Sequence, residues 1–198
     1  MGLVCLDMEG VLTPEIWFET AKLFGIPELE ITTKDEPDYD RLMKRRISIL
    51  KDNNIGIDKI ADVISEIEPL EGAKDFLDSL RRFTQVIIVS DTFYQFAMPL
   101  MEKLGFPALF ANSLEITDGM ITGYSLRTNP SKVNTVRALK SIGFKVISSG
   151  DSYNDIGMIK ESDSGFLFRT NEKIRSEYPE IPAFYEYEDL FEAIKRSL

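Results

Sequence analysis

Apolar residues along this chain form short unbroken runs that alternate with stretches of helical period. The runs rich in strand-forming residues cover 3–6, 85–90, 108–111, 145–149 and 165–168. Runs of this kind are typical of strands buried on both faces of a parallel sheet. Between and after these runs, apolar spacings of three and four residues predict helices over 72–83, 93–104, 130–139, 153–162 and 187–195. The alternation predicts an α/β fold with a doubly wound, Rossmann-like parallel sheet.

The pattern changes between residues 14 and 70. Amphipathic segments predict helices over about 14–25, 39–52 and 57–67, with a polar loop over 27–38 and no strand-like run among them. A sheet that continued here would need alternating strands and helices. We therefore expect a small helical cap over 14–70, inserted after the first strand, and an α/β core built from 1–13 and 71–198.

A second departure from the alternation lies near the middle of the chain. Asp118-Gly119 separates the alternating segments 114–117 and 120–124. Asp-Gly between two such segments is the two-residue signal for a type I′ turn. The sequence therefore predicts a β-hairpin here.

Composition narrows the chemistry and the partners. The 198 residues suffice for one domain with a modest insertion, and the net charge of -10 argues against nucleic acid or an anionic membrane as partner. The chain contains no histidine, which excludes histidine-dependent nucleophiles, bases and metal sites. We expect a small-molecule substrate. A homodimer is compatible with the sequence, which contains nothing that fixes the oligomeric state.

The single cysteine and the N-terminal residues bear on the cellular location of the protein. Cys5 lies in the first predicted strand and cannot form an internal disulfide, so we expect a small core hydrophobe, with a reactive thiol as the alternative. No basic and apolar leader opens the chain, and no apolar run approaches the length that spans a membrane. These features predict a cytoplasmic protein.

Polar clusters follow the first, second and fourth of the predicted strands. They are Asp7 with Glu9, Ser90-Asp91-Thr92, and the segment from Gly150 to Asp155. If the strands are parallel neighbours, the clusters converge at one edge of the sheet. Carboxylates gathered there without histidine need a hard cation, and oxygen ligands suit Mg²⁺. A hydroxyl from Ser90 and the amine of Lys132 could then hold phosphate, which indicates phosphoryl transfer with a carboxylate nucleophile.

These motifs resemble, in order and spacing, those of the haloacid dehalogenase superfamily. The matching motifs are Asp7-Met8-Glu9-Gly10-Val11, Ser90 after an apolar strand, Lys132, and Gly150-Asp151-Ser152-Tyr153-Asn154-Asp155. Within the superfamily the chain is most similar to phosphoserine phosphatases, and among those to the group with homoserine phosphotransferase activity. The segments that carry this closer resemblance are 5–11, 14–17, 37–40, 90–94 and the last motif.

The resemblance implies a role for each matching residue. Asp7 would be the nucleophile that forms an aspartyl phosphate, and Glu9 the general acid/base. Mg²⁺ would be held by Asp7, the backbone carbonyl of Glu9 and Asp151, with Asp155 in support. The remaining residues would contact the substrate: Ser90, the Asp91 amide and Lys132 at the phosphate, Asn154 beside it, and Glu15 and Arg46 at the amino and carboxylate groups.

One position departs from the family pattern. The family normally has aspartate at the acid/base position, and this chain has Glu9. The extra methylene shifts the carboxylate by about a bond length, and a misplacement near ~1 Å can cost on the order of a hundredfold in rate. Slower attack by water on the aspartyl phosphate would lengthen the lifetime of this intermediate and leave time for an alcohol acceptor to attack it instead. This departure favours phosphotransfer to homoserine as an additional activity.

Helical spacing gives an independent reason to single out Arg46. It lies seven residues after Tyr39, four after Leu42 and four before Leu50, on the apolar face of its helix. Arginine rarely faces inward without a carboxylate partner. The partner is either Glu15, in a structural ion pair, or the carboxylate of a substrate.

Simpler interpretations remain for several of these residues. Lys132 is alternatively a surface lysine, and Glu15 is favoured at a helix start by the helix dipole alone. Tyr153 and Asn154 are alternatively a helix cap and its neighbour, and Trp17 is most simply part of the core.

The function also has alternatives. One is a phosphatase of another small phosphate monoester, and another is a non-catalytic protein that binds phospho-amino acids. A phospho-aspartate switch is disfavoured because receiver domains carry no helical insert after the first strand. A nucleotide-binding strand is disfavoured because the chain has no Gly-x-x-x-x-Gly-Lys-Ser/Thr loop.

Overall fold

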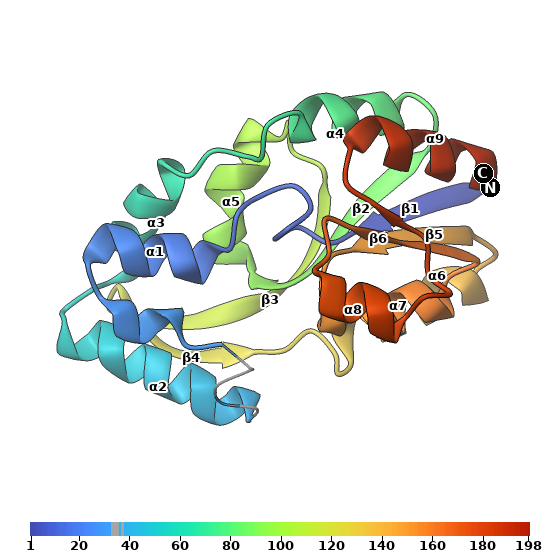
Figure 1. Cartoon of the computed structure of the whole chain (residues 1–198). Coiled ribbons are helices and arrows are strands. Elements are labelled where there is room, and N and C mark those ends of the chain that lie inside the picture. Colours follow the sequence, from blue (N-terminus) through green and yellow to red (C-terminus); the bar gives the residue numbers. More distant parts are fainter. Residues whose placement is uncertain (33–35, 37) are drawn as a thin grey trace.

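A seven-stranded sheet forms the centre of the molecule, in the order β4-β3-β2-β1-β5-β6-β7. The structure is a computed structural model that describes residues 1–32, 36 and 38–198 (Figure 1). The strands are β1 (Gly2–Leu6), β2 (Gln85–Phe93), β3 (Ala108–Thr117), β4 (Met120–Ser125), β5 (Lys145–Gly150), β6 (Ser164–Phe168) and β7 (Ala183–Phe184). All neighbouring strands pair in parallel except β3 and β4. The predicted α/β fold class is confirmed.

Helices cover both faces of this sheet. The core helices are α4 (Ala73–Arg81), α5 (Tyr94–Lys103), α6 (Ser131–Ser141), α7 (Tyr153–Glu161), α8 (Glu172–Glu177) and α9 (Tyr187–Ser197). Figure 1 shows α4 and α9 above the sheet and α6, α7 and α8 below it. None of the helices in the described part of the chain is long and apolar enough to span a bilayer.

The first strand is buried on both sides, as its continuous apolar run predicts. Val4 and Leu6 belong to the cluster on one face of the sheet, and Leu3 and Cys5 to the cluster on the other. This follows from the two-residue period of a strand. Burial raises the pKa of the Cys5 thiol to about 12, so Cys5 is a core residue and the alternative of a reactive thiol is not supported.

The segment after β1 is helical. It contains α1 (Ile16–Phe24), the 3₁₀-helix η1 (Pro27–Glu30), α2 (Tyr39–Asp52) and α3 (Ile57–Ser65). The prediction of a loop over 27–38 is wrong in its first part, where residues 27–30 form η1. The side chain of Leu29 in this helix is fully buried. Positions 33–35 and 37 of that loop, including the Pro37 that contributed to the resemblance, lie outside the described residues. The division into a cap over 14–70 and a core stays a prediction.

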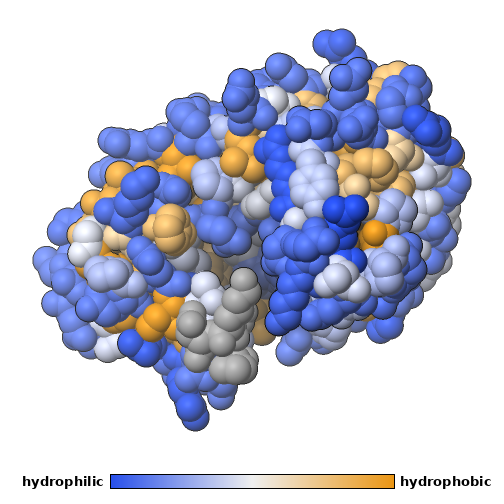
Figure 2. Space-filling view, viewed as in Figure 1, coloured by the Kyte–Doolittle hydropathy of each residue, from blue (hydrophilic) through white to orange (hydrophobic). Residues whose placement is uncertain are grey.

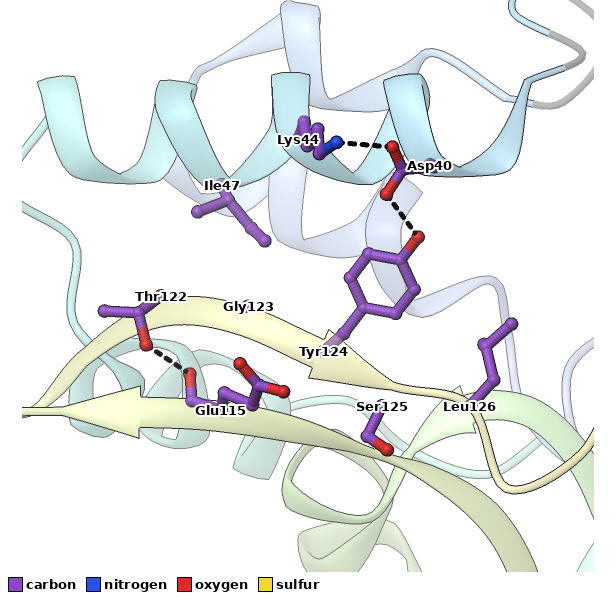
Figure 3. Close-up of a pocket in the computed structure, with 9 residues that line it drawn as sticks. All are labelled: Asp40, Lys44, Ile47, Glu115, Thr122, Gly123, Tyr124, Ser125 and Leu126. Atoms are coloured by element: carbon purple, nitrogen blue, oxygen red, sulfur yellow. Dashed lines mark hydrogen bonds and ion pairs between the residues drawn. The ribbon is translucent and has the colours of Figure 1, made fainter.

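The hairpin of the core reaches the helical insert. Asp118 and Gly119 both have positive φ, 51° and 77°, as a type I′ turn requires. The turn carbonyl of Gly119 accepts from Ile57 N at 2.8 Å, at the start of α3. Tyr124 donates to Asp40 of α2 at 3.0 Å across a groove of about 520 Å³ (Figure 3). Figure 2 shows the surface indented between insert and core.

Three elements differ from the prediction. The expected strand over 108–111 and the first hairpin arm are one strand, β3, because the polar pair Asn112-Ser113 interrupts the apolar run without interrupting the backbone. Sequence analysis also missed α8 and β7, which are six and two residues long. Elements this short present too few positions to show a period.

Candidate active site

The ends of β1, β2 and β5 meet at one edge of the sheet. β1 lies between β2 and β5 and pairs in parallel with both. Asp7, directly after β1, donates its backbone N–H to the carbonyl of Ser149 at 2.9 Å. Because parallel neighbours end on the same side, this arrangement brings the three predicted polar clusters together. Two of them lie at the ends of β1 and β5, whereas Ser90-Asp91-Thr92 lies inside β2, which continues to Phe93.

Lys132 is buried among carboxylates at this edge. Its Nζ lies 2.8 Å from Asp7 Oδ1, 2.7 Å from Asp155 Oδ1 and 3.8 Å from Asp91 Oδ2. Lys132 is 2% exposed, so the alternative of a surface lysine is wrong. An ion pair this deep is retained only where both charges have partners, and α6 carries Lys132 to the strand ends.

The carboxylates outnumber the cation. Burial, and next the charge of Asp155, raise the pKa of Asp151 to about 7. The same two causes raise the pKa of Asp7 well above its usual range, although Lys132 opposes them. Burial lowers the pKa of Lys132, but Asp155 and Asp7 outweigh burial and hold that pKa well above its ordinary value. The site therefore carries a surplus of negative charge that a further cation would relieve.

Three of these carboxylates fit a divalent cation. Oxygens of Asp7, Asp151 and Asp155 lie within 4.8 Å of one another, and an all-oxygen set suits Mg²⁺. Gly10 has φ +76°, and a Cβ there would lie 2.4 Å from Asp151 Cγ. The backbone after Glu9 thus packs directly against the Asp151 carboxylate.

Asp155 is fixed by contacts with the protein itself. Its Oδ2 accepts from the backbone N–H groups of Asp151 at 3.0 Å and Ser152 at 3.1 Å, and Oδ1 accepts from Lys132. A Cβ at Gly150 would lie 2.1 Å from Asp155 Cγ. Asp155 therefore holds the loop between β5 and α7 in place, which suits a supporting position behind Asp7 and Asp151.

The Ser90–Thr92 segment lines the same edge. Ser90 is 1% exposed, and its Oγ accepts from Thr92 N at 3.2 Å. Asn154 donates from Nδ2 to Asp91 Oδ2 at 3.2 Å, which links this segment to the loop after β5. Asp91 therefore contacts both Asn154 and Lys132 through its side chain.

Glu9 joins the strand end to the helical insert. Its Oε1 accepts from the backbone N–H of Ile16, the first residue of α1, at 2.8 Å. Burial, and next the charge of Glu15, raise the pKa of Glu9 to about 8. Glu15 also contributes to the raised pKa of Asp151. Glu9 and Glu15 therefore lie together near the cluster.

Arg46 points inward from α2, as its spacing predicts. It is 7% exposed, its Cζ lies 4.3 Å from the Trp17 ring centre, and its Nη2 donates to the Ile31 carbonyl at 2.6 Å. Burial lowers its pKa to about 10, which leaves it charged at neutral pH. In the described part of the chain, the buried Nε–H of Arg46 has no hydrogen-bond partner. Trp17, expected as simple core, supports this guanidinium.

Sequence reasoning missed three contributors to this edge. Trp17 lies in the segment 14–17 that carries the closer resemblance, but its apolar position predicted only a core residue. Tyr39 lies on the apolar face of its predicted helix and in the segment 37–40 that carries the closer resemblance, but neither signal gave it a role at the site. Burial, and next the charge of Asp91, raise the pKa of its hydroxyl. Asn112 fell between two predicted strands, and its partners are backbone groups distant in sequence.

Comparisons with known proteins identify the family of this chain. The family model for haloacid dehalogenase-like hydrolases matches residues 22–160, more than half of the chain. The phosphoserine phosphatase ThrH of Pseudomonas aeruginosa is 49% identical over 191 residues, which cover 96% of this chain and 93% of that protein. The chain belongs to the haloacid dehalogenase-like hydrolases.

Solved structures resemble the whole hydrolase. A substrate-bound phosphoserine phosphatase complex superposes with a TM-score of 0.78 at 26% identity, covering 98% of this chain and 97% of that chain. A phospho-aspartyl intermediate analogue of phosphoserine phosphatase gives a TM-score of 0.78 at 25% identity, with 97% and 98% covered. The likeness therefore extends over both the helical insert and the sheet of this hydrolase.

Proposed function

We propose that this hydrolase is a phosphoserine phosphatase that works through an aspartyl phosphate on Asp7. The observation that carries the proposal is the buried Asp7 carboxylate, held by Lys132 beside Asp151 and Asp155. The names of the similar proteins support the substrate. A carboxylate so placed has an electrophilic phosphate as its natural reaction partner.

In the first step an oxygen of Asp7 attacks phosphorus. The bond from phosphorus to the seryl oxygen breaks, and Glu9, protonated in accordance with its raised pKa, gives its proton to the leaving serine. Asp7 Oδ1 accepts from Met8 N and from Lys132 Nζ, both at 2.8 Å. These contacts hold the carboxylate in one orientation for attack.

In the second step an acceptor hydroxyl attacks the phosphorus of the aspartyl phosphate. Glu9 removes the proton of that hydroxyl, and the bond to Asp7 breaks to regenerate the carboxylate. Water as acceptor gives inorganic phosphate, and homoserine gives phosphohomoserine. The hydrogen bond from Ile16 N to Glu9 fixes where this base can act.

The phosphate would be held by three donors, the Ser90 hydroxyl, the Asp91 backbone N–H and the Lys132 amine. Mg²⁺ would be held by Asp7, the Glu9 carbonyl and Asp151, with Asp155 in support, and it would neutralise charge on the phosphate oxygens. The all-oxygen donor set and its surplus negative charge support this assignment.

The insert would recognise the amino acid. The unpartnered Nε–H of Arg46 is a buried, charged donor, and leaving such a group unsatisfied is costly. We propose that the substrate carboxylate occupies it, that Glu15 takes the ammonium group, and that Asn154 lies beside the substrate. The cytoplasmic location and the homodimer stay predictions.

The test is a product analysis with phosphoserine and Mg²⁺, with and without homoserine, that quantifies serine, phosphate and phosphohomoserine. We expect serine in both reactions, and phosphohomoserine at the expense of phosphate when homoserine is present. Phosphate unaffected by homoserine would remove the transferase activity alone. No release of serine would overturn the substrate assignment.

A further inference from the structure

Ser90 to Thr92 depart from the regular ladder just where β2 enters the site. β2 and β3 pair in register as far as Val89 with Phe110, and the next pair is Phe93 with Asn112. Three residues of β2 therefore lie opposite one residue of β3, which is the geometry of a bulge. Backbone groups in a bulge lose their ladder partners and need others.

Asn112 supplies one of those partners. It is 2% exposed, and its Nδ2 donates to the Asp91 carbonyl at 2.8 Å. The same peptide group carries the N–H of Thr92, which donates to Ser90 Oγ at 3.2 Å. The hydrogen bond from Asn112 therefore orients the Asp91–Thr92 peptide group. The N–H of that peptide group points at the Ser90 hydroxyl.

This contact determines what the Ser90 hydroxyl can do. A hydroxyl offers one proton and two acceptor lone pairs. The Thr92 N–H occupies a lone pair of Ser90 Oγ, so the proton of Ser90 is directed away from that peptide. It is then available to a phosphate oxygen in the site.

The orientation of the Asn112 amide is itself fixed. Its Oδ1 accepts from the Arg127 backbone N–H at 3.0 Å, so its Nδ2 must face Asp91. The Arg127 side chain in turn donates through Nη2 to the Ser131 carbonyl at 3.3 Å and also to Thr135 Oγ1. Ser131 and Thr135 belong to α6, the helix that carries Lys132.

We propose that Asn112 is a positioning residue that aims the Ser90 hydroxyl at the phosphate and, through Arg127, fixes the Ser90–Thr92 segment relative to the helix of Lys132. This inference rests on the phosphate-binding role proposed for Ser90. Both hydrogen bonds of the Asn112 side chain join it to backbone groups, those of Asp91 and Arg127, so it would act on Ser90 through the Asp91–Thr92 peptide.

A double-mutant cycle tests whether Asn112 acts through Ser90. The proteins are the wild type, Asn112→Ala, Ser90→Ala and the double variant, assayed with phosphoserine and with p-nitrophenyl phosphate. We expect Asn112→Ala to lower kcat/KM about tenfold for both substrates, since a small misplacement at the phosphate affects each alike. In the Ser90→Ala background the same change should cost less than about twofold, because coupled residues are not additive.

Controls separate positioning from stability. Asn134 also donates within this region, from Nδ2 to Thr128 Oγ1 at 3.0 Å, but makes no contact with Asp91 or Ser90, so Asn134→Ala should leave kcat/KM unchanged. A cooperative thermal unfolding transition shows which of the variants are folded. If Asn112→Ala does not fold, Asn112→Asp replaces it, because the carboxylate still accepts from Arg127 while losing the donor to Asp91.

The outcomes separate this inference from the proposed function. Equal losses from the Asn112 change in both Ser90 backgrounds, or no loss in the wild type, would overturn the inference. Coupling seen with p-nitrophenyl phosphate in an enzyme that does not cleave phosphoserine would support the inference and overturn the substrate assignment.

Discussion

Arg46 is a buried cation to which we assign recognition of the substrate carboxylate. Its guanidinium lies against the Trp17 ring and is anchored by the Ile31 carbonyl. The stacked ring leaves only the guanidinium edge for further partners, and the unpartnered Nε–H lies on that edge. Arginine in this arrangement suits a planar carboxylate, which is the group that separates phosphoserine from simple phosphate monoesters.

The first prediction concerns Arg46→Ala. We expect KM for phosphoserine to rise about tenfold to a hundredfold, the cost of one charge-assisted hydrogen bond, with kcat changed little. KM for p-nitrophenyl phosphate, which has no carboxylate, should stay the same. Steady-state kinetics with both substrates measure this, and Arg45→Ala, an exposed neighbour on α2, is the matched control. An unchanged KM for phosphoserine would assign Arg46 a structural role.

At the scale of elements, the contact between Glu9 and α1 connects catalysis to the insert. Glu9 accepts from the N–H of Ile16, one of the donors at the start of a helix that have no partner within it. The family's usual aspartate is one methylene shorter. The glutamate of this chain reaches the helix end, so the start of α1 would fix the position of the acid/base group that we propose.

Glu9→Asp and Glu9→Gln separate the two roles of this side chain. Glu9→Asp keeps the acid but loses the bond to Ile16, so we expect a loss of about 1 kcal/mol in unfolding free energy. Glu9→Gln keeps the acceptor and should retain stability, while kcat falls about a hundredfold or more because proton transfer is lost. Denaturant unfolding and steady-state kinetics measure both, and equal stabilities would contradict the capping role.

Much of the site and fold could be predicted because the signals are local. Asp7 and Asp151 each follow an apolar strand, Ser90 lies after the apolar part of β2, and the parallel pairing of those strands brings the three together. Arg46 followed from helical period alone. Asn112 could not be predicted, because a polar residue inside β3 looks like the end of a strand, and its partners are the Asp91 carbonyl in the bulge and the Arg127 N–H, both distant in sequence.

At the scale of the whole molecule, charge in the site opposes folding. The chain has no histidine, so between about pH 5.5 and pH 8.5 the principal side chains that titrate are the buried carboxyls. The folded pKa of Asp151 is about 7 and that of Glu9 about 8, both above their ordinary values. The folded state therefore binds more protons, and its stability is lost as pH rises through these values.

We accordingly expect metal-free protein to unfold at a lower temperature at pH 8.5 than at pH 5.5, by about 5 °C or more. Mg²⁺ should raise Tm more at pH 8.5, where the carboxylates are ionised, than at pH 5.5. Thermal unfolding in chelator and in Mg²⁺ measures both effects, and Asp151→Asn should reduce each. A metal-free Tm that rises with pH would contradict the account.

Acid quenching of the enzyme during turnover would reveal whether Asp7 carries the phosphoryl group. Enzyme is mixed with Mg²⁺ and phosphoserine that is radiolabelled in its phosphate group, and the reaction is stopped with acid within milliseconds. The protein is then digested, and the labelled peptide is identified by mass spectrometry. We expect a phosphoryl group on Asp7, and neither label nor turnover in a folded Asp7→Asn variant. Turnover without labelled protein, or by Asp7→Asn at the wild-type rate, would contradict the role proposed for Asp7.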